Sequence, residues 1–330
     1  MNIIKPPKLD KGDTIGIVAT SFPFPHNEKS DYYHEYQRGI KIINSMGFQI
    51  QESKNLRKRK WWAAGTAKER AEDINGMFEN QDINAIMVHD GGQSAITILE
   101  YLDYDLIKMN PKPFIGFSDV TNILSAIYSK TGIVSFYGPL VTYGFGKHWR
   151  KFSDDKISKG KDYFQKILSS HNPLGYISPI TEWESWKPGK ARGKLFGGNL
   201  SMLLSLVGTS YFPLKNELAD SILFWEIDNT ESYWIERGLY VLKYSGILDI
   251  ISGMIVGKLP GIKNTCWKKS SEPSPKEIVL EILKEYNFPV MGGFDFGHET
   301  IDIPMPIGIE VSMNSQNLSF EILESAVKRK

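Results

Sequence analysis

Apolar runs of strand length alternate with amphipathic stretches through the first half of the chain. Residues 14–19 form a short apolar run rich in β-branched side chains, and residues 33–46 place apolar side chains at helical spacing. The same order recurs where the apolar run 85–88 precedes a helical pattern at 94–102. Each pair predicts a strand followed by a helix. Repeated units of this kind are typical of a parallel sheet with functional loops at the carboxyl ends of its strands.

A polar and lysine-rich stretch interrupts this pattern between about residues 144 and 193. Prolines and glycines punctuate it, and such a composition is typical of a connecting segment. Beyond it the pattern of apolar positions predicts strands at 222–225, 253–257 and 307–311, and helices near 236–244 and 275–286.

Two α/β domains account for this organisation. We predict an N-terminal parallel-sheet domain of the flavodoxin or Rossmann type over residues 1–165, and a linker and substrate loop over 166–190. A smaller C-terminal α/β domain is expected over 191–330. The length of 330 residues exceeds what one hydrophobic core usually organises. Two lobes imply a cleft between them, and the active site is expected in that cleft.

Composition narrows the classes of function. The 39 lysines and arginines nearly balance the 38 aspartates and glutamates, so a net charge of +1 gives no field to attract nucleic acid or an anionic membrane. The one cysteine cannot form an internal disulfide, and the start of the chain lacks the apolar stretch of a signal peptide. No apolar run reaches the roughly 20 residues that cross a bilayer. These features predict a soluble, cytoplasmic protein without a nucleic-acid or membrane partner.

Ser118 stands where an apolar strand at 114–117 gives way to a helical pattern at 120–130. A hydroxyl on such a turn lies beside unpaired amide groups at the helix start, and those amides can stabilise an oxyanion. However, the motif GFSDV lacks the last glycine of G-x-S-x-G, and a serine or aspartate before a helix is more often a simple N-cap. From the motif alone, both roles stay open.

A second turn of this kind follows the preceding strand. The pair Gly91-Gly92 lets the backbone approach a ligand closely, so this turn can supply another oxyanion amide. An ordinary turn that requires a positive φ explains the same glycines.

Glu226 and His298 are the candidate acid–base groups. Glu226 ends a strand so apolar that an unpartnered carboxylate there would be costly to bury, so a partner is expected. That partner is either an imidazole or, in a simple strand-end salt bridge, a lysine or arginine. His298 lies in a glycine-rich loop after another strand, where an imidazole can act as a general base, although most lone histidines are surface groups.

Other motifs give weaker evidence for a functional site. The basic run 57–60 followed by Trp61-Trp62 resembles a nucleic-acid patch, but a solvated loop fits the near-neutral total charge better. The pair His298-Glu299 does not extend to H-E-x-x-H, and a single cysteine excludes thiolate clusters, so we expect no metal. Neither a Walker loop nor G-x-G-x-x-G is present, so we expect no nucleotide cofactor.

Together these segments resemble the LD-carboxypeptidase family of serine peptidases, which includes murein tetrapeptide carboxypeptidases and microcin C self-immunity peptidases. The resemblance spans nearly the whole chain, and the ordered set is more specific than any one piece. Its pieces are KGDTIGIVA at 11–19, AGT at 64–66, ERA at 69–71, DIN at 73–75, GG at 91–92, IGFSD at 115–119, TG at 131–132, FYGP at 136–139, GGNL at 197–200, FWE at 224–226, FGH at 296–298 and PIG at 306–308.

The resemblance assigns roles to the candidates. It implies that Ser118 is the nucleophile, His298 its general base and Glu226 the carboxylate that orients the imidazole. The amides of Gly92 and Asp119 would form the oxyanion hole. It also implies a homodimer, a metal-free and cofactor-free reaction, and a serine and a Glu–His pair on separate domains. With a base of this kind we expect activity to fall on acidification through a pKa of roughly 6 to 7.

The substrate is the open question. The sequence is closer to the microcin C branch, which implies a peptidyl or aminoacyl nucleotide as substrate. In that branch an indole stacks on the nucleobase, and we expect Trp186 or Trp183 to do so through an exposed face, unless both pack between the domains. Gly91 and Tyr137 are further expected substrate contacts. Residues 228–231 depart from both branches.

The alternatives are release of terminal D-alanine from murein tetrapeptides, and a catalytically silent binding protein on the same scaffold. An esterase of the α/β-hydrolase type is disfavoured because G-x-S-x-G is absent.

Overall fold

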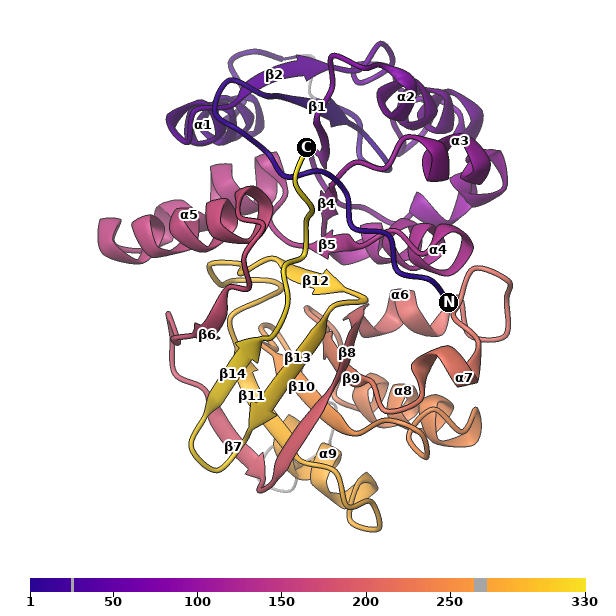
Figure 1. Ribbon diagram of the computed structural model, residues 1–330, viewed down its shortest axis with the longest axis vertical. Coiled ribbons are helices and arrows are strands. Elements are labelled where there is room, and N and C mark those ends of the chain that lie inside the picture. The colour runs from indigo at the N-terminus through magenta and orange to yellow at the C-terminus, as the bar shows by residue number, and fades with distance from the viewer. Residues whose placement is uncertain (25–26, 264–271) are drawn as a thin grey trace.

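The computed structural model describes residues 1–24, 27–263 and 272–330, and the strands within them form two sheets in two stacked lobes (Figure 1). None of the helices in the described residues is long and apolar enough to cross a membrane. The predicted α/β class with an N-terminal parallel sheet is confirmed.

The first sheet has the order β12-β5-β4-β3-β1-β2 among the described strands. Its members are β1 (Thr14–Val18), β2 (Gln49–Glu52), β3 (Ala85–Val88), β4 (Phe114–Gly116), β5 (Ser135–Tyr137) and β12 (Met305–Ile307). Strands β1 to β5 are parallel in the order 2-1-3-4-5, which is the doubly wound order of flavodoxin-like folds. All five therefore end at one edge of the sheet, where a ligand site is expected.

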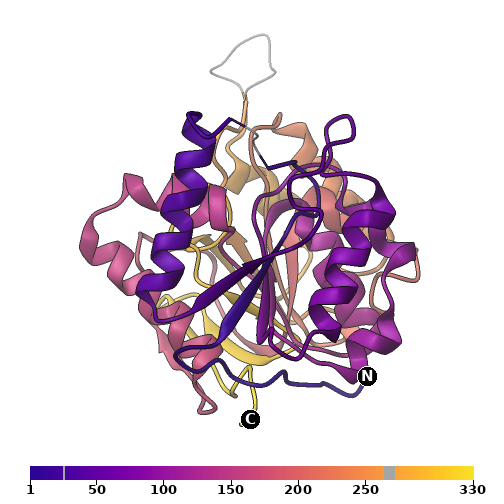
Figure 2. The same ribbon diagram turned by 90° about the horizontal axis from the view of Figure 1, so that it is seen from above.

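Helices cover both faces of this sheet (Figure 2). They are α1 (Asp31–Ser45), α2 (Ala67–Glu79), α3 (Tyr104–Met109), α4 (Thr121–Thr131) and α5 (Asp154–Ser169). Local signals fix their starts, since Ser30 caps α1 and a reciprocal capping box of Thr66 and Glu69 begins α2. The helical pattern predicted at 94–102 is a 3₁₀ helix, η1 (Ala95–Tyr101).

The second sheet has the order β6-β14-β13-β8-β9-β10-β11-β7 among the described strands. Its members are β6 (Gly175–Ile177), β7 (Glu184–Lys187), β8 (Lys190–Asn199), β9 (Ile222–Glu226), β10 (Gly253–Gly257), β11 (Val290–Phe294), β13 (Glu310–Asn314) and β14 (Ser319–Ile322). The neighbours β8, β9, β10 and β11 are parallel. The helices of this lobe are α6 (Leu200–Leu204), α7 (Lys215–Leu218), α8 (Tyr233–Tyr244) and α9 (Pro275–Ile282).

The two lobes are interlaced rather than joined end to end. Strand β12 lies within the predicted C-terminal domain but pairs antiparallel with β5 of the first sheet. The predicted strand at 307–311 is accordingly wrong as one element, because Gly308 adopts a φ of +93° and separates β12 from β13. Two strands, β6 and β7, lie inside the segment predicted as a linker. The predicted domain boundaries themselves stay a prediction.

Candidate active site

Ser118 lies at the carboxyl end of β4, on a strained turn into a helix. Its φ is +60°, a conformation that costs a non-glycine residue of order 1–3 kcal/mol. The turn continues through a short 3₁₀ helix, Ser118–Val120, into α4. Gly116 is needed here, because a Cβ at this position would come within 2.7 Å of Val120. Strain of this kind on a serine at a strand end is typical of a nucleophile held up for reaction.

The Gly91-Gly92 turn lies directly beside Ser118. A Cβ built on Gly91 would lie 3.6 Å from the Cβ of Ser118. Gly92 has a φ of +146°, and a Cβ there would lie 2.4 Å from the Cβ of Ser21, so glycine is required. Among the described residues, the amides of Gly92 and Asp119 donate no hydrogen bond to another protein group. Both amides are free to bind an anionic oxygen next to Ser118.

The side chain of Asp119 ties this turn to the segment that carries Ser118. It accepts hydrogen bonds from the hydroxyl of Ser21 and from the backbone amides of Ser94 (3.2 Å) and Ala95 (3.3 Å). Burial is the largest influence on this carboxyl and raises its pKa to about 6, against the lowering effect of these hydrogen bonds. Asp119 therefore fixes the loop after the Gly91-Gly92 turn relative to Ser118.

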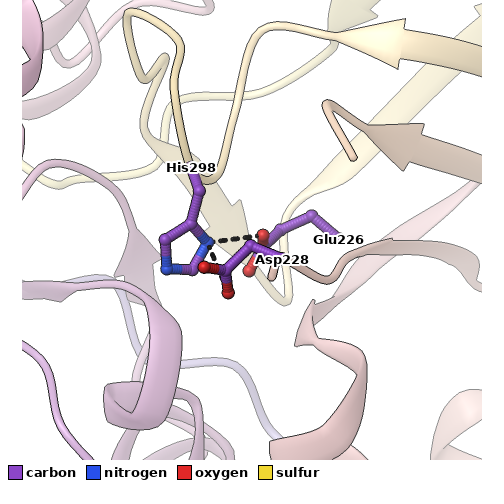
Figure 3. A group of neighbouring side chains, drawn as sticks. All are labelled: Glu226, Asp228 and His298. Carbon is purple, nitrogen blue, oxygen red and sulfur yellow. Dashed lines mark hydrogen bonds and ion pairs between the residues drawn. The ribbon is translucent and has the colours of Figure 1, made fainter. Parts of the chain in front are cut away.

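Glu226 and His298 meet at the carboxyl ends of β9 and β11. The Nδ1 atom of His298 lies 2.7 Å from Oε2 of Glu226, and its second ring nitrogen points away from the carboxylates (Figure 3). Glu226 is fully buried, and its partner is the imidazole rather than a lysine or arginine. The loop approaches so closely that a Cβ on Gly297, whose φ is +95°, would lie 2.5 Å from Cγ of Glu226.

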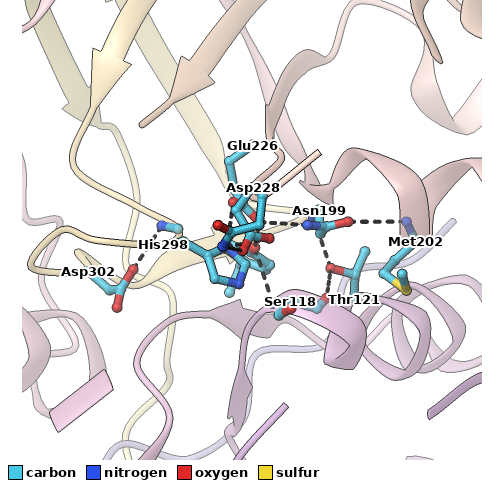
Figure 4. Close-up of polar contacts among 11 residues, drawn as sticks. Ser118, Thr121, Asn199, Met202, Glu226, Asp228, His298 and Asp302 are labelled. Atoms are coloured by element: carbon cyan, nitrogen blue, oxygen red, sulfur yellow. Dashed lines mark hydrogen bonds and ion pairs between the residues drawn. The ribbon is translucent and has the colours of Figure 1, made fainter. Parts of the chain in front are cut away.

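Ser118 and the Glu226–His298 pair face each other across the two lobes. In Figure 4, Ser118 lies on the side of the imidazole opposite Glu226 and Asp228. The ring of Phe117, the residue before Ser118, packs edge-on against the imidazole with 5.0 Å between centroids. The structure therefore brings all three predicted catalytic side chains to one place.

Asp228 is a site residue that the sequence reasoning did not assign. Its Oδ1 lies 3.3 Å from Nδ1 of His298, so a second carboxylate faces the same ring nitrogen. The only signal was its position two residues beyond Glu226, the last residue of β9. Glu226, Asp228 and His298 also form the group in the described residues whose ligand atoms, within 4.8 Å of one another, could hold a metal ion.

These carboxylates change the acid–base behaviour of His298. Burial lowers the pKa of the imidazole, but the charge and hydrogen bond of Glu226, with the charges of Asp228 and Asp302, raise that pKa to about 9. This pKa is above the expected 6 to 7, chiefly because of the charge and hydrogen bond of Glu226, with the charge of Asp228 adding to them. Burial raises the pKa of Glu226, and the charge of His298 together with three hydrogen bonds brings it below its ordinary value.

Tyr137 connects Ser118 to the Glu226–His298 pair. Its hydroxyl donates to Oε1 of Glu226 (2.7 Å) and accepts a hydrogen bond from the backbone amide of Ser118 (3.2 Å). The side chain is fully buried, so the expectation that it contacts substrate is wrong. It lies behind the reacting groups and links the first sheet to the second.

Asn199 makes a second link of this kind. Its side chain donates to Oε1 of Glu226 (3.0 Å), and its backbone amide donates to Oγ1 of Thr121 (3.0 Å). The Thr121 hydroxyl in turn donates to the carbonyl of Ser118 (2.6 Å), and Figure 4 follows this path. The residue lies in the GGNL motif, but the pattern alone gave it no role.

The two tryptophans expected to stack on a nucleobase are not equally exposed. Trp183 is only 5% exposed, stacks on Phe294 at 4.0 Å between centroids, and donates to Asp295 (2.8 Å), so the expectation of an exposed indole is wrong for it. Trp186 is half-buried over Gly292 and donates to Glu184 (3.0 Å). It lies on β7 beside the start of β11, whereas His298 follows the end of β11.

Comparisons with known proteins point to one family. Residues 15–138 match the LD-carboxypeptidase N-terminal domain, and residues 192–313 match the LD-carboxypeptidase C-terminal domain. The chain is 31% identical to the microcin C7 self-immunity protein MccF of Escherichia coli, over 96% of this chain and 94% of that protein. It is 32% identical to a probable murein peptide carboxypeptidase of Bacillus subtilis, over 94% of this chain and 92% of that protein.

Solved structures agree with these matches. The structure of MccF in complex with glutamyl sulfamoyl guanosine superposes with a TM-score of 0.84 at 28% identity, covering 98% of this chain and 99% of that chain. The two-sheet architecture therefore has a counterpart in a related protein of nearly the same length.

Proposed function

Because the chain belongs to the LD-carboxypeptidase family, we propose that it hydrolyses an amide bond through an acyl-enzyme on Ser118. The observation that carries this proposal is the buried Glu226–His298 pair, placed by one sheet opposite a strained serine at the end of the other. A serine hydroxyl is a weak nucleophile at neutral pH, so it needs a neighbouring base of this kind.

The reaction follows from these positions. The Oγ atom of Ser118 attacks the carbonyl carbon while the free ring nitrogen of His298 accepts the hydroxyl proton. The amides of Gly92 and Asp119 bind the oxyanion of the tetrahedral intermediate. His298 then gives its proton to the leaving amine, and water hydrolyses the acyl-enzyme by the same steps.

Glu226 keeps the imidazole in place during both transfers. Its Oε2 fixes the Nδ1–H tautomer and stabilises the imidazolium, while its Oε1 is held by Tyr137 and Asn199. Tyr137 and Asn199 are positioning residues, since they act through Glu226 and through the backbone of Ser118.

We propose peptidyl or aminoacyl nucleotides of the microcin C type as substrates. The full-length similarity to MccF, a relative with a solved complex of glutamyl sulfamoyl guanosine, supports this choice. Release of D-alanine from murein tetrapeptides is the second candidate, supported by the similar identity to the Bacillus subtilis protein. A homodimer and a cytoplasmic location also belong to the proposal, on the resemblance to the family.

Mass spectrometry of reaction products separates the two substrates. Incubation with aspartyl sulfamoyl adenosine should give free aspartate and sulfamoyl adenosine, and the Ser118→Ala variant should give neither. Release of D-alanine from a murein tetrapeptide, without cleavage of the nucleotide, would replace the first substrate class by the second. Cleavage of neither substrate would favour a silent binding protein.

A further inference from the structure

Arg70 is a buried cation beside the site that the proposed reaction does not use. It lies on α2 and is only 3% exposed. Its guanidinium donates to the backbone carbonyls of Thr20 and Ser94 (3.3 Å) and to Oγ1 of Thr97 (3.0 Å), and all of these acceptors are neutral oxygens. Burial lowers the pKa of the guanidinium, and the negative charge of Asp119 acts against this effect.

The guanidinium joins two segments that flank the Gly91-Gly92 turn. On one side, Thr20 precedes Ser21, and a Cβ built on the second glycine of the turn would lie 2.4 Å from the Cβ of Ser21. On the other side, Ser94 follows the turn and stands directly before η1. One side chain of α2 therefore holds both flanks of the turn that carries the proposed oxyanion amide.

Ser94 is held on both sides of its backbone. Its amide donates to Oγ of Ser21 (2.8 Å) and to Oδ2 of Asp119 (3.2 Å). Its carbonyl accepts from Arg70 (3.3 Å) and from the hydroxyl of Thr97 (2.7 Å). The carboxylate belongs to the segment that carries the candidate nucleophile, and the cation belongs to α2. Any rotation of this loop would therefore break a hydrogen bond to one of them.

An arginine suits this place for a geometric reason. Its planar head presents several N–H donors in a fixed fork, whereas a lysine ammonium is a compact point charge. The fork reaches one oxygen of the first segment and two of the second. The arrangement has a local cost, because Nε of Arg70 is buried without a hydrogen-bond partner among the described residues. A local cost of this kind is typical of a group that serves a functional site.

We propose that Arg70 is a positioning residue for the oxyanion hole, and that it acts by fixing the direction of the Gly92 amide. It does not touch substrate, because it is buried behind the turn. The inference rests on the proposed function, in which this amide binds the oxyanion beside Ser118, and deepens it. Loss of the guanidinium leaves the serine and the imidazole in place but loosens one of the two amides that stabilise the transition state.

A serine-directed fluorophosphonate reports on this role without a natural substrate. Oγ of Ser118 forms a bond to phosphorus, fluoride leaves, and His298 accepts the serine proton, while the phosphoryl oxygen occupies the oxyanion hole. The second-order rate of labelling is measured at several pH values by mass spectrometry of the intact protein. The size of this rate depends on the oxyanion amides, and its dependence on pH follows His298.

Arg70→Met should lower the labelling rate by about 10- to 100-fold, since a small displacement of an oxyanion donor has an effect of this size. Arg70→Lys keeps the charge without the fork and should recover only part of the loss. In both variants the pH of half-maximal rate should stay that of the unmodified protein, because the imidazole and its carboxylates are untouched. A shift of that pH would show that Arg70 acts through His298 and would overturn the proposal.

Thr97 gives a milder test in case Arg70→Met does not fold. Thr97 is exposed, and Thr97→Val removes one acceptor of the guanidinium, so labelling should slow by about 2- to 10-fold. Thr97→Ser keeps the hydroxyl and should recover most of that loss. If Arg70→Met folds, its rate decides, and otherwise the rate of Thr97→Val decides. An unchanged rate in the deciding variant would overturn the role of Arg70.

Lys112→Met is the matched control for the loss of a buried cation. Lys112 is 7% exposed and donates to the carbonyls of Met77 (2.9 Å) and Asn80, at the carboxyl end of α2. This variant should lower the melting temperature and leave the labelling rate unchanged. An equal loss of rate in Lys112→Met would make the effect of Arg70 one of general stability and would reject its positioning role.

Failure of this role differs from failure of the proposed function. No labelling of Ser118 in the folded, unmodified protein would reject the proposed function itself. Labelling of Ser118 at the same rate in all variants would reject the role of Arg70 and leave the catalytic serine standing.

Discussion

The two halves of the site are built by different physical means. On the first sheet, backbone conformation positions the groups. Ser118 has a φ of +60° and Gly92 a φ of +146°, and these conformations place the hydroxyl of Ser118 beside the Gly92 turn. On the second sheet, side-chain electrostatics sets the properties of the groups. Glu226 is fully buried, and the pKa of His298 is raised to about 9. The first half depends on backbone conformation held by the Asp119 carboxyl, whereas in the second half the charge of the imidazole itself changes with pH.

This difference assigns separate tasks to the lobes. In the proposed reaction the Ser118 side supplies geometry, and the Glu226–His298 side supplies proton affinity. Tyr137 and Asn199 are the hydrogen-bonded contacts that keep the two halves in register, since each touches Glu226 and connects to the backbone of Ser118. Substitutions in the two halves should therefore impair activity in different ways that kinetics can distinguish.

Ser118→Ala should have the largest effect. Without the hydroxyl no acyl-enzyme forms, and turnover should fall by roughly 10⁴- to 10⁶-fold, as for other serine nucleophiles. The melting temperature should stay close to that of the unmodified protein, because the side chain adds little packing. A folded variant with near-normal kcat would remove Ser118 from the mechanism.

Glu226→Gln should come next. The amide no longer stabilises the imidazolium or fixes the same tautomer, and kcat should fall by about 10³- to 10⁴-fold. Glu310→Gln is the matched control, because it removes an exposed carboxylate paired with Arg192 (2.7 Å) on β13. Equal kinetics for the two variants would show that Glu226 is structural.

Tyr137→Phe should cost about tenfold in kcat with little change in KM, since one of the hydrogen bonds that hold Glu226 is lost. Less of the Glu226 charge is then neutralised, so the pKa of His298 should rise and the acid limb of kcat/KM should move to higher pH. Tyr104→Phe removes a comparable hydrogen bond to Leu99 (2.8 Å) away from the site and should leave the pH profile in place. If the acid limb of kcat/KM does not shift in Tyr137→Phe, Tyr137 has only a packing role.

Acidification should have the smallest effect for a single step. Below the raised His298 pKa of about 9, kcat/KM should fall about tenfold for each pH unit, because the protonated ring cannot accept the serine proton. Asp228→Asn removes one carboxylate from the ring and should shift this limb to lower pH. If the acid limb of kcat/KM does not move in Asp228→Asn, Asp228 is not a cause of the raised His298 pKa.

The same raised pKa of about 9 also affects stability, since the protonated ring is favoured in the folded state. The resulting stabilisation is present below the unfolded pKa of about 6.5 and is lost as pH rises through about 9. Thermal melting from pH 6 to 10 should therefore show a decline that is smaller in Asp228→Asn.

Local signals made the fold and the turn that carries Ser118 predictable. The strand–turn–helix order around Ser118 and the Gly91-Gly92 turn are contiguous in sequence, so periodicity and turn chemistry identify them. Gly308 shows the limit, because an apolar run continued through it and only its positive φ separates β12 from β13.

The acid–base half depends on tertiary structure. Glu226 and His298 lie 72 positions apart and meet only because β9 and β11 end at the same edge of the second sheet. Side chains on other elements bury Tyr137 and place Asp228 beside His298. The pattern of apolar positions within one element does not reveal such contacts. The polar stretch that suggested an exposed Trp183 likewise concealed its stack on Phe294.

Covalent trapping tests the proposed catalytic group most directly. The protein is treated with a serine-directed fluorophosphonate at several pH values, and the adduct is located by peptide mass spectrometry. We expect one adduct, on Ser118, at a rate that rises toward pH 9 and falls sharply in Glu226→Gln. No adduct on the folded protein, an adduct on a different serine, or a labelling rate unaffected by Glu226→Gln would contradict a Ser118–His298–Glu226 site.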